Sequence, residues 1–280
     1  MAIYKPTELI QFLAGLGISP KKGMSQNFLI DGNIIRKIVA TAKVEPGDVV
    51  LEIGPGPGAL TEALLEAGAT VLAVEKDNTL AKALARIKSD RGTLKVFCED
   101  IMEFDVDRIL KTHLKPGQKA KVIANLPYHL TTAIVTKFVM LREIFAKLVI
   151  MIQDEVAKRY VSSPGCKEYG SITVFLNYYT NASYGFKVSK NCFFPPPKIE
   201  SAIVVLDLKE PPYVSNEEKF FELTRTAFEH RRKMLRASLR DLYEQDAVTE
   251  ALSSLGLDPQ SRPEVLSLEQ FILLFEKLDG

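Results

Sequence analysis

The chain has 280 residues, 46% of them hydrophobic and 25% charged, so it can bury a core for one sizeable domain and a smaller one. Its formal net charge of +1 excludes a uniformly basic or acidic protein. Any attraction to nucleic acid must therefore come from local clusters of charge.

The cysteines and histidines give no pattern of a disulfide framework or a metal site. Cys98, Cys166 and Cys192 have no C-x-x-C spacing, and the three histidines lie far apart, so we expect reduced thiols and no metal. No apolar run reaches the roughly 18 residues that a membrane span needs. The apolar stretch 9–18 is followed, not preceded, by lysines, unlike a secretory signal. We expect a cytoplasmic protein.

Short β-branched runs alternate with helical segments, a pattern typical of a parallel sheet covered by helices. Helices are predicted over 59–67 and 78–88. A buried strand is predicted over 49–53, and further strands over 70–75, 94–98, 121–124 and 148–152. Further along, 171–179 and 201–208 are predicted as strands without a helix between them. Two such late strands indicate an antiparallel hairpin at one edge of the sheet.

The segment 209–213 (KEPPY) interrupts this pattern, and three or four helices without a strand signal follow it. We place the domain boundary there. The sequence thus predicts an α/β domain over 1–210 and a small all-α domain over 211–280.

A glycine–proline loop, 54–58 (GPGPG), joins the first predicted strand to a helix. Glycines let the backbone turn sharply and let a ligand approach the main chain closely. The loop lacks the lysine of a phosphate-cradling P-loop, which argues against ATP. A dinucleotide site or an ordinary strand-to-helix turn remains an alternative.

Carboxylates follow the next two strands. Glu75 ends the second strand and could accept hydrogen bonds from both ribose hydroxyls of a nucleoside, while Asp100, after the third, could accept one from the adenine amino group. Each could also be a solvated charge at a strand end. Because the carboxyl ends of parallel strands meet in one crevice, the pair predicts a nucleoside site, for NAD or for S-adenosylmethionine.

The tetrapeptide Asn125-Leu126-Pro127-Tyr128 ends the fourth strand. Adenine N6 is a poor nucleophile because its lone pair is delocalised into the ring. The Asn125 side-chain oxygen and the Leu126 carbonyl could accept hydrogen bonds from its amino group, and Pro127 could aim them. Tyr128 could stack on an unstacked base. The alternative is a strand-terminal turn with Tyr128 in the core.

Over nearly its whole length, the chain resembles the ribosomal RNA adenine dimethyltransferases of the KsgA type. The segments that carry the resemblance are Gln26-Asn27-Phe28-Leu29 with Asp31, Glu52-Ile53-Gly54-Pro55-Gly56, Glu75, Asp100-Ile101, Asn125-Leu126-Pro127-Tyr128, the aromatic–proline motif 193–198 and the basic run 220–239. One departure is Ser25, preceded by Met24, where the family usually has glycine. It bears on the flexibility of the N-terminal segment over the cofactor.

The resemblance implies a Rossmann-like class I methyltransferase sheet, mostly parallel with an antiparallel late strand. It implies that segment 1–45 lies over S-adenosylmethionine and that 211–280 binds RNA. The cofactor-binding residues it indicates are Gln26, Asn27, Leu29, Glu52, Gly54, Gly56, Glu75, Lys76, Asp100, Ile101 and Asn125. The catalytic set is Asn125, Leu126, Pro127 and Tyr128.

RNA contacts are expected from aromatic and basic side chains. The run 225–240 holds six basic residues and one acid, Glu229. On a continuous helix, Arg232, Arg236 and Arg240 would share a face that could follow phosphates, although such a face is often only solvated. Lys21 and Lys22 are weaker candidates. The expected substrate-binding residues are Tyr128, Phe193, Phe194, Arg225, Arg232 and Arg236, with Phe194 the exposed member of its pair.

The implied reaction is transfer of methyl groups from S-adenosylmethionine to N6 of two adjacent adenosines near the 3′ end of small-subunit ribosomal RNA, during ribosome biogenesis. The expected partners are this RNA and the immature small subunit, with the protein a monomer. Alternatives are a large-subunit enzyme of the antibiotic-resistance type, a DNA adenine methyltransferase, or a mainly non-catalytic assembly factor. Nothing in the sequence suggests the hydride-transfer site of a dehydrogenase.

Overall fold

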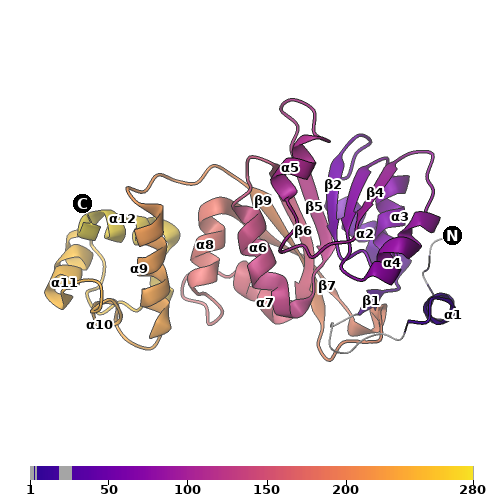
Figure 1. Cartoon of the computed structure of the whole chain (residues 1–280). Helices are drawn as coiled ribbons and strands as arrows, with labels where there is room; N and C mark the ends of the chain where they lie inside the picture. The colour runs from indigo at the N-terminus through magenta and orange to yellow at the C-terminus, as the bar shows by residue number, and fades with distance from the viewer. Residues whose placement is uncertain (1–2, 4, 19–26, 280) are drawn as a thin grey trace. The chain divides into compact units, whose positions relative to one another are not determined.

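A computed structural model of the chain describes residues 3, 5–18 and 27–279. The chain divides into two compact units (Figure 1). The first comprises Met1–Ala157 and Ser183–Leu208, and the second comprises Lys158–Ala182 and Lys209–Gly280. One division point thus lies close to the boundary expected near 210, whereas 158–182 joins the second unit.

A seven-stranded sheet forms the centre of the first unit, in the order β4-β3-β2-β5-β6-β9-β7. Its first five strands pair in parallel, and β9 pairs antiparallel with β6, as expected for a late strand. The strands are β2 (Val49–Ile53), β3 (Thr70–Val74), β4 (Thr93–Phe97), β5 (Ala120–Asn125), β6 (Phe145–Gln153), β7 (Thr180–Val188) and β9 (Ser201–Leu208).

The direction of strand succession reverses between β2 and β5, which are neighbours in the sheet. In open α/β sheets, the crevice at the carboxyl ends of the strands beside such a reversal is where ligands bind. All five residues of β2 are buried, since helices cover both faces of a parallel sheet. The topology therefore places a binding crevice at the glycine loop that follows β2.

Helices α2 (Gly32–Thr41) and α3 (Ala59–Glu66) pack on one face of the sheet, where Ile35, Ile38 and Leu64 join Val50 and Val71 in the main core. Further helical segments among the described residues of this unit are α4 (Asn78–Ala83), η2 (Leu84–Arg86), α5 (Val106–Lys111), η3 (Tyr128–Leu130), α6 (Thr131–Val139), α7 (Asp154–Tyr160), which continues into the second unit, and η4 (Lys190–Cys192).

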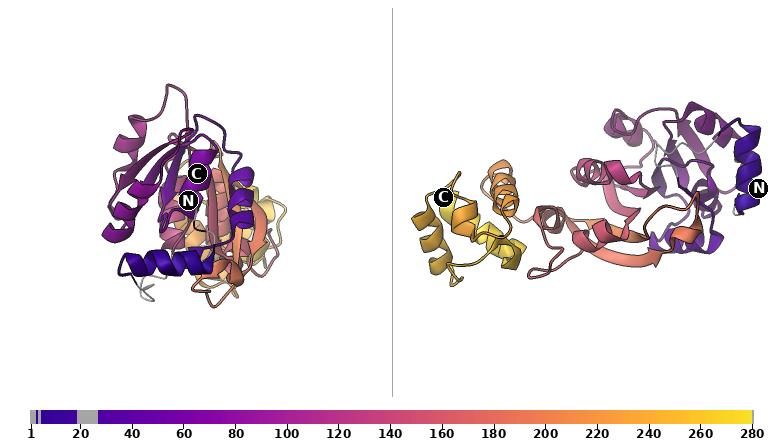
Figure 2. Two further views of the ribbon diagram at one scale, coloured as in Figure 1. Left: turned by 90° about the vertical axis from the view of Figure 1, so that its right-hand side faces the viewer. Right: turned by 90° about the horizontal axis from the view of Figure 1, so that it is seen from below.

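The N-terminal helix α1 (Pro6–Gly15), drawn in indigo, also belongs to the first unit (Figure 2). Its Leu9 and Leu13 pack with Phe28 and Leu80 in a separate apolar cluster. Phe28 belongs to β1 (Phe28–Leu29), which pairs antiparallel with β8 (Phe193–Phe194) in a two-stranded sheet. The N-terminal segment and the late aromatic pair are thereby held together.

One predicted strand is wrong. Residues 171–179 form the helix α8 (Ser171–Tyr179), and the strand β7 follows it directly. The segment is rich in β-branched and aromatic residues, which favoured a strand. A short apolar run cannot be assigned by periodicity alone, because a buried helix and a buried strand are both continuously apolar.

The second unit is helical, with aromatic side chains at its centre. Phe220 and Phe221 pack with Tyr178 and Tyr179, and Phe275 packs against Phe220. The two tyrosine hydroxyls donate to Glu217 at 3.2 and 2.8 Å. Its elements besides α8 are α9 (Glu217–Glu229), α10 (Leu235–Ser238), α11 (Gln245–Ser254), η5 (Pro263–Val265) and α12 (Leu268–Asp279). In the described part of the chain, no helix combines the length and apolarity that a bilayer crossing demands.

Candidate functional site

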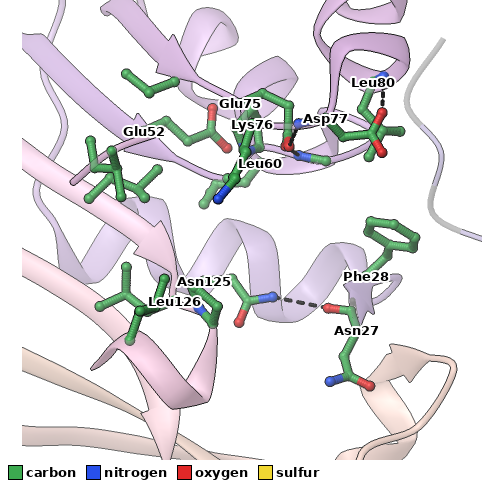
Figure 3. A pocket seen from close by; sticks show the side chains of 18 of the residues that line it. Asn27, Phe28, Glu52, Leu60, Glu75, Lys76, Asp77, Leu80, Asn125 and Leu126 are labelled. Carbon is green, nitrogen blue, oxygen red and sulfur yellow. Dashed lines mark hydrogen bonds between the residues drawn. The ribbon is translucent and has the colours of Figure 1, made fainter. Parts of the chain in front are cut away.

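A cavity of about 350 Å³ lies at the carboxyl ends of β2, β3 and β5 (Figure 3). Its wall is formed by the loop after β2, the carboxylates after β3 and β4, the tetrapeptide after β5, and segment 27–29. Every residue expected to bind the cofactor lines it except Gln26, which lies outside the described residues, as do Lys21, Lys22, Met24 and Ser25. The sequence-distant motifs therefore converge on one cavity.

The glycine loop turns through the left-handed region, with φ of 63° at Gly54 and 57° at Gly56. L side chains rarely adopt this conformation, so glycine avoids a strain there. A Cβ atom on Gly56 would also lie 3.0 Å from two ring carbons of Phe28. The loop can thus remain close to the cavity and to Phe28 only with glycine at this position.

Glu75 is buried at the cavity wall, and backbone amides fix both of its oxygens. Oε2 accepts from the Gly56 amide at 3.0 Å, and Oε1 accepts from the Asp77 amide at 2.9 Å. Burial raises the pKa of Glu75, and these two hydrogen bonds oppose the rise. Because an ionised carboxylate offers about four acceptor positions, each oxygen keeps capacity for a ligand hydroxyl.

Asp100 is held in its charged form by two donors. Lys76 donates to Oδ2 at 2.7 Å, and the Met102 amide donates to Oδ1 at 2.9 Å. The hydrogen bond from Lys76 is the largest cause that lowers the pKa of Asp100. The carboxylate therefore remains an acceptor at neutral pH. Lys76, the ion-pair partner of Asp100, also lines the cavity.

Glu52 is 1% exposed, at the base of the cavity. Burial raises its pKa to about 8, with the nearby charge of Glu75 adding to the rise. The Thr61 hydroxyl donates to Oε2 at 2.6 Å and opposes it. Glu52 is thus a largely protonated acid inside the sheet, which the sequence pattern did not indicate.

The side-chain amide of Asn125 is oriented by one hydrogen bond. Its Nδ2 donates to the backbone carbonyl of Asn27 at 3.1 Å (Figure 3). The two ends of an amide differ in role, so this bond makes Oδ1 the end that can accept from a ligand. Leu126 follows in a buried position, its amide donating to the Met151 carbonyl at 3.1 Å.

Tyr128 lies half-buried on the cavity wall and not in the core. Its hydroxyl is paired with the Ser201 hydroxyl at 2.7 Å, and burial raises the pKa of Tyr128. Pro127 before it has a φ of −63°, the value that its ring dictates. The neutral ring is thus anchored at its polar tip.

The aromatic pair does not line the cavity. Phe193 is 2% exposed and belongs to the main core, opposite Leu29 in the β1–β8 pair. Phe194 is half-buried, opposite Phe28, and packs on the α1 cluster. Phe194 is therefore the more exposed member, but the structure brings neither ring to Tyr128.

The basic run is not one helix, and the expected shared face of Arg232, Arg236 and Arg240 is wrong. Helix α9 ends at Glu229, a turn follows, and α10 begins at Leu235. The Leu235 amide donates to the Ser261 carbonyl at 2.9 Å, a contact that local sequence cannot show.

The basic side chains of this run differ in their surroundings. Arg225 on α9 and Arg232 in the turn are exposed, and Arg236 on α10 is half-buried. Arg231, in contrast, pairs with Glu264 at 3.3 Å and donates to the Cys166 carbonyl at 3.0 Å. Arg231 therefore has a structural role within the helical unit.

Sequence reasoning missed several cavity residues. Phe28, Leu80 and His129 line it, and Asp77 caps α4 by accepting from the Thr79 amide at 2.9 Å. The aspartate before a helical run was a recognisable capping signal. Among the described residues, no group of three or more His, Cys, Asp or Glu side chains is arranged to hold a metal ion.

Comparison with known proteins identifies the family. The model of the family described as "Ribosomal RNA adenine dimethylase" matches residues 18–279. The chain belongs to this family. It is 58% identical over 278 residues to "Ribosomal RNA small subunit methyltransferase A" of Protochlamydia amoebophila, with 99% of this chain and 98% of the relative covered. It is 46% identical to the same-named protein of Chlamydia caviae, with 100% and 99% covered.

Solved structures agree on the fold of the family. A dimethyladenosine transferase from Plasmodium falciparum matches with a TM-score of 0.73 at 24% identity, covering 88% of this chain and 95% of the other. The 23S rRNA methyltransferase ErmE matches with a TM-score of 0.67 at 26% identity, covering 91% and 100%. The chain therefore has the class I methyltransferase fold. As a member of the adenine dimethylase family, it uses S-adenosylmethionine as its cofactor.

The cavity of the dimethylase fits this cofactor by the chemistry of its walls. The nucleoside half offers vicinal hydroxyls and an amino group, and Glu75 and Asp100 are oriented acceptors for such donors. Ile53, Val74 and Ile101 give an apolar surface between them for a flat base. The left-handed Gly54 and Gly56 present no side chain, so a ligand can lie against the backbone at these two positions.

Proposed function

We propose that this dimethylase methylates N6 of two adjacent adenosines near the 3′ end of small-subunit ribosomal RNA, within the immature small subunit. The observation that carries the proposal is the oriented Asn125 amide, whose acceptor end lies in the same cavity as Glu75 and Asp100. The names of the 58% and 46% identical relatives support the small subunit as the source of the RNA.

Bound S-adenosylmethionine supplies an electrophilic methyl group. The residues of the chain supply position and polarisation. Glu75 would accept from the ribose hydroxyls and Asp100 from the adenine amino group of the cofactor. The Asn125 oxygen and the Leu126 carbonyl would accept from the target N6 amino group, which pulls electron density toward nitrogen. Tyr128 would stack on the target base, with its hydroxyl held by Ser201.

The helical unit would hold RNA through phosphate contacts. Arg225, Arg232 and Arg236 lie in this unit, with Arg225 and Arg232 exposed. Folded RNA is recognised largely by shape and backbone contacts, so a few exposed guanidinium groups suit such a surface. We propose that the protein acts as a monomer in the cytoplasm, where its three free thiols would stay reduced.

The likeness to ErmE favours 23S ribosomal RNA, of the large subunit, as a second candidate substrate. Separated immature small subunits and large subunits, each incubated with the enzyme and labelled S-adenosylmethionine, distinguish the two. The expected result is label in small-subunit RNA, with mass mapping placing two methyl groups on each of two adjacent adenosines. Label confined to the large-subunit RNA would overturn the proposal.

A further inference from the structure

Lys137, on helix α6, reaches from that helix to the loop that follows β4. Its ammonium donates to the Met102 carbonyl at 2.7 Å and to the Ile101 carbonyl at 3.1 Å. Ile101 lines the cofactor cavity, and Asp100 immediately precedes it. The side chain of Lys137 therefore holds the loop that carries the Asp100 carboxylate.

The other end of α6 is tied to the tetrapeptide. The Leu130 amide donates to the Pro127 carbonyl at 3.0 Å, and the Thr131 hydroxyl at the start of α6 donates to the same carbonyl at 3.3 Å. A helix is a stiff element over so short a length. One rigid segment thus joins the predicted target-base residues to Lys137.

The two carbonyls are oriented toward one charge. Backbone carbonyls that converge on an ammonium make charge-assisted hydrogen bonds, which are shorter and stronger than neutral ones. The charge of Lys137 is also among the causes that lower the pKa of Asp100. An uncharged side chain at 137 would leave two loop carbonyls without this partner, and the loop could then move.

We infer that Lys137 is a positioning residue, which fixes the Asp100–Met102 loop relative to the Asn125–Tyr128 tetrapeptide and so aligns the cofactor side of the cavity with the target-base side. The inference rests on the proposed roles of Asp100 and Asn125. It gives Lys137 no contact with cofactor or RNA.

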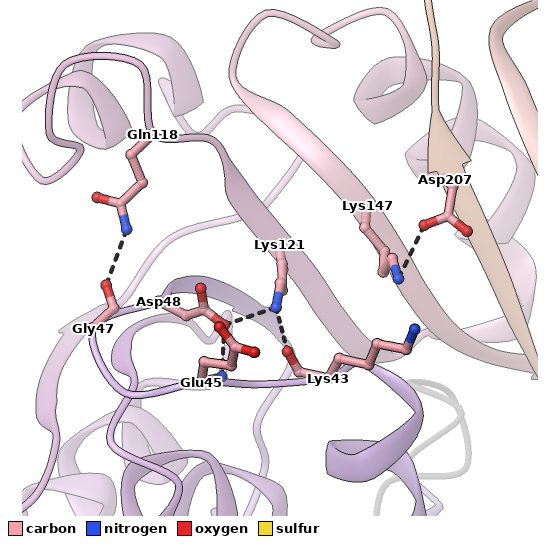
Figure 4. Close-up of polar contacts among 8 residues, drawn as sticks. All are labelled: Lys43, Glu45, Gly47, Asp48, Gln118, Lys121, Lys147 and Asp207. Atoms are coloured by element: carbon pink, nitrogen blue, oxygen red, sulfur yellow. Dashed lines mark hydrogen bonds and ion pairs between the residues drawn. The ribbon is translucent and has the colours of Figure 1, made fainter.

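Lys121 provides a matched control (Figure 4). It is also a partly buried lysine that donates to a backbone carbonyl, that of Lys43, and it pairs with the Asp48 carboxylate at 2.7 Å. It lies near the amino end of β5, whereas the cavity lies at the carboxyl end. Replacing either lysine with methionine removes the same charge from a similar environment.

The test measures binding of S-adenosylhomocysteine by calorimetry to the full chain and to K137M, K137R and K121M, together with thermal unfolding of each. We expect K137M to raise the dissociation constant about tenfold, because binding must then also order a loop that has lost two charged hydrogen bonds. K121M should stay within about twofold because it lies far from the cavity. K137R should recover most of the affinity, since a guanidinium also donates to two carbonyls.

Equal dissociation constants for K137M and the unchanged protein would overturn the inference, as would an equal loss in K121M. If K137M is unfolded at the assay temperature, K137Q replaces it. The inference then requires K137Q to bind more weakly than K137R at matched stability, and equal binding refutes it. Because this assay needs no RNA, its outcome is separate from the choice of ribosomal subunit in the proposed function.

Discussion

The Asn125 amide nitrogen donates to the backbone carbonyl of Asn27, 98 residues earlier in the chain, at 3.1 Å. The bond links the end of β5 to the segment that enters β1. It has two consequences at once. It fixes which end of the amide can accept a hydrogen bond from a substrate. It also makes the position of segment 27–29 depend on Asn125, the residue that is expected to act on the target base.

The first prediction follows from this arrangement. Replacing Asn125 with alanine removes an acceptor that is already oriented, so we expect kcat to fall about 100-fold, as when one oriented polar group is removed from other active sites. The dissociation constant of S-adenosylhomocysteine should change little, because Glu75 and Asp100 remain. Methyl transfer to ribosomal RNA and calorimetry measure the two quantities.

A suitable control is Asn33→Ala on the exposed surface of α2, where Asn33 accepts from Arg36 at 2.7 Å. It should leave both quantities unchanged. Full methyl transfer by the Asn125 variant would contradict the assigned role. A large loss of cofactor affinity with kcat preserved would instead mean that Asn125 acts through segment 27–29.

The second prediction concerns pH and the buried Glu52. Its pKa rises from 4.5 to about 8 in the folded protein. Between these values the folded state keeps a proton that the unfolded state has released, so raising the pH favours unfolding. Glu52 therefore contributes a loss of stability that begins near pH 4.5, grows up to about pH 8 and is constant above it, with a slope of up to ~1.4 kcal/mol per pH unit.

Glu52→Gln tests this directly, because glutamine resembles the protonated acid, can still accept from Thr61, and does not titrate. The stability of the variant relative to the unchanged protein should increase with pH across that window. Denaturant unfolding at a series of pH values measures it. Glu66→Gln, at an exposed position on α3, should show no such trend. Parallel pH profiles for the Glu52 variant and the unchanged protein would refute the assignment.

The site was readable from the sequence where its residues follow strand ends. The glycine loop, Glu75 and the tetrapeptide lie at the ends of the buried strands β2, β3 and β5, and Asp100 lies shortly after the more exposed edge strand β4. Parallel strands bring such positions together whatever their separation in the chain. The elements that were predicted wrongly depend on tertiary contacts, which the local sequence does not show. Helix α8 is buried on more than one side, so its pattern resembles a strand.

Tertiary contacts also explain why two hydrogen bonds at the site could not be predicted from the sequence. Lys137 and the Met102 carbonyl are 35 residues apart, and Asn125 and Asn27 are 98 apart. No local pattern marks either pair, because each depends on how a helix or a strand end packs against a distant loop. The break after Glu229 is similar, since the contact between Leu235 and Ser261 forms only in the folded unit.

The third prediction concerns the basic residues that follow the break after Glu229. Arg232 and Arg236 do not share a helical face, yet both belong to the basic turn and short helix of the second unit. If each contacts one phosphate, the double alanine variant should bind ribosomal RNA more weakly, and the slope of log K against log salt should flatten by about one to two. Filter binding over a salt series measures the slope.

The control for this variant is Lys219→Ala, which removes a basic residue of the same unit that is already paired with Asp279 at 3.0 Å. It should leave the salt slope unchanged. If the double variant keeps the full slope, the RNA phosphates contact another surface of the protein.

The last prediction separates the two parts of Tyr128. Its ring can stack on a base, and its hydroxyl is held by Ser201 at 2.7 Å. Tyr128→Ala should lose the stacking, worth about 1–3 kcal/mol per base, and thus lower kcat/KM for RNA by about 10- to 100-fold. Tyr128→Phe keeps the ring and loses only the anchor, so its loss should be smaller, and Ser201→Ala should resemble it.

The ranking of kcat/KM among these three variants tests the role of the ring, because a tyrosine that merely filled the core would give a different ranking. In that case the phenylalanine and alanine variants would differ in stability, while kcat/KM for RNA at a temperature where each is folded would be equal. A base analogue with a larger stacking surface in place of the target adenine should in turn bind the phenylalanine variant nearly as well as the unchanged protein, and the alanine variant poorly. Equal binding by the phenylalanine and alanine variants would exclude stacking on this ring.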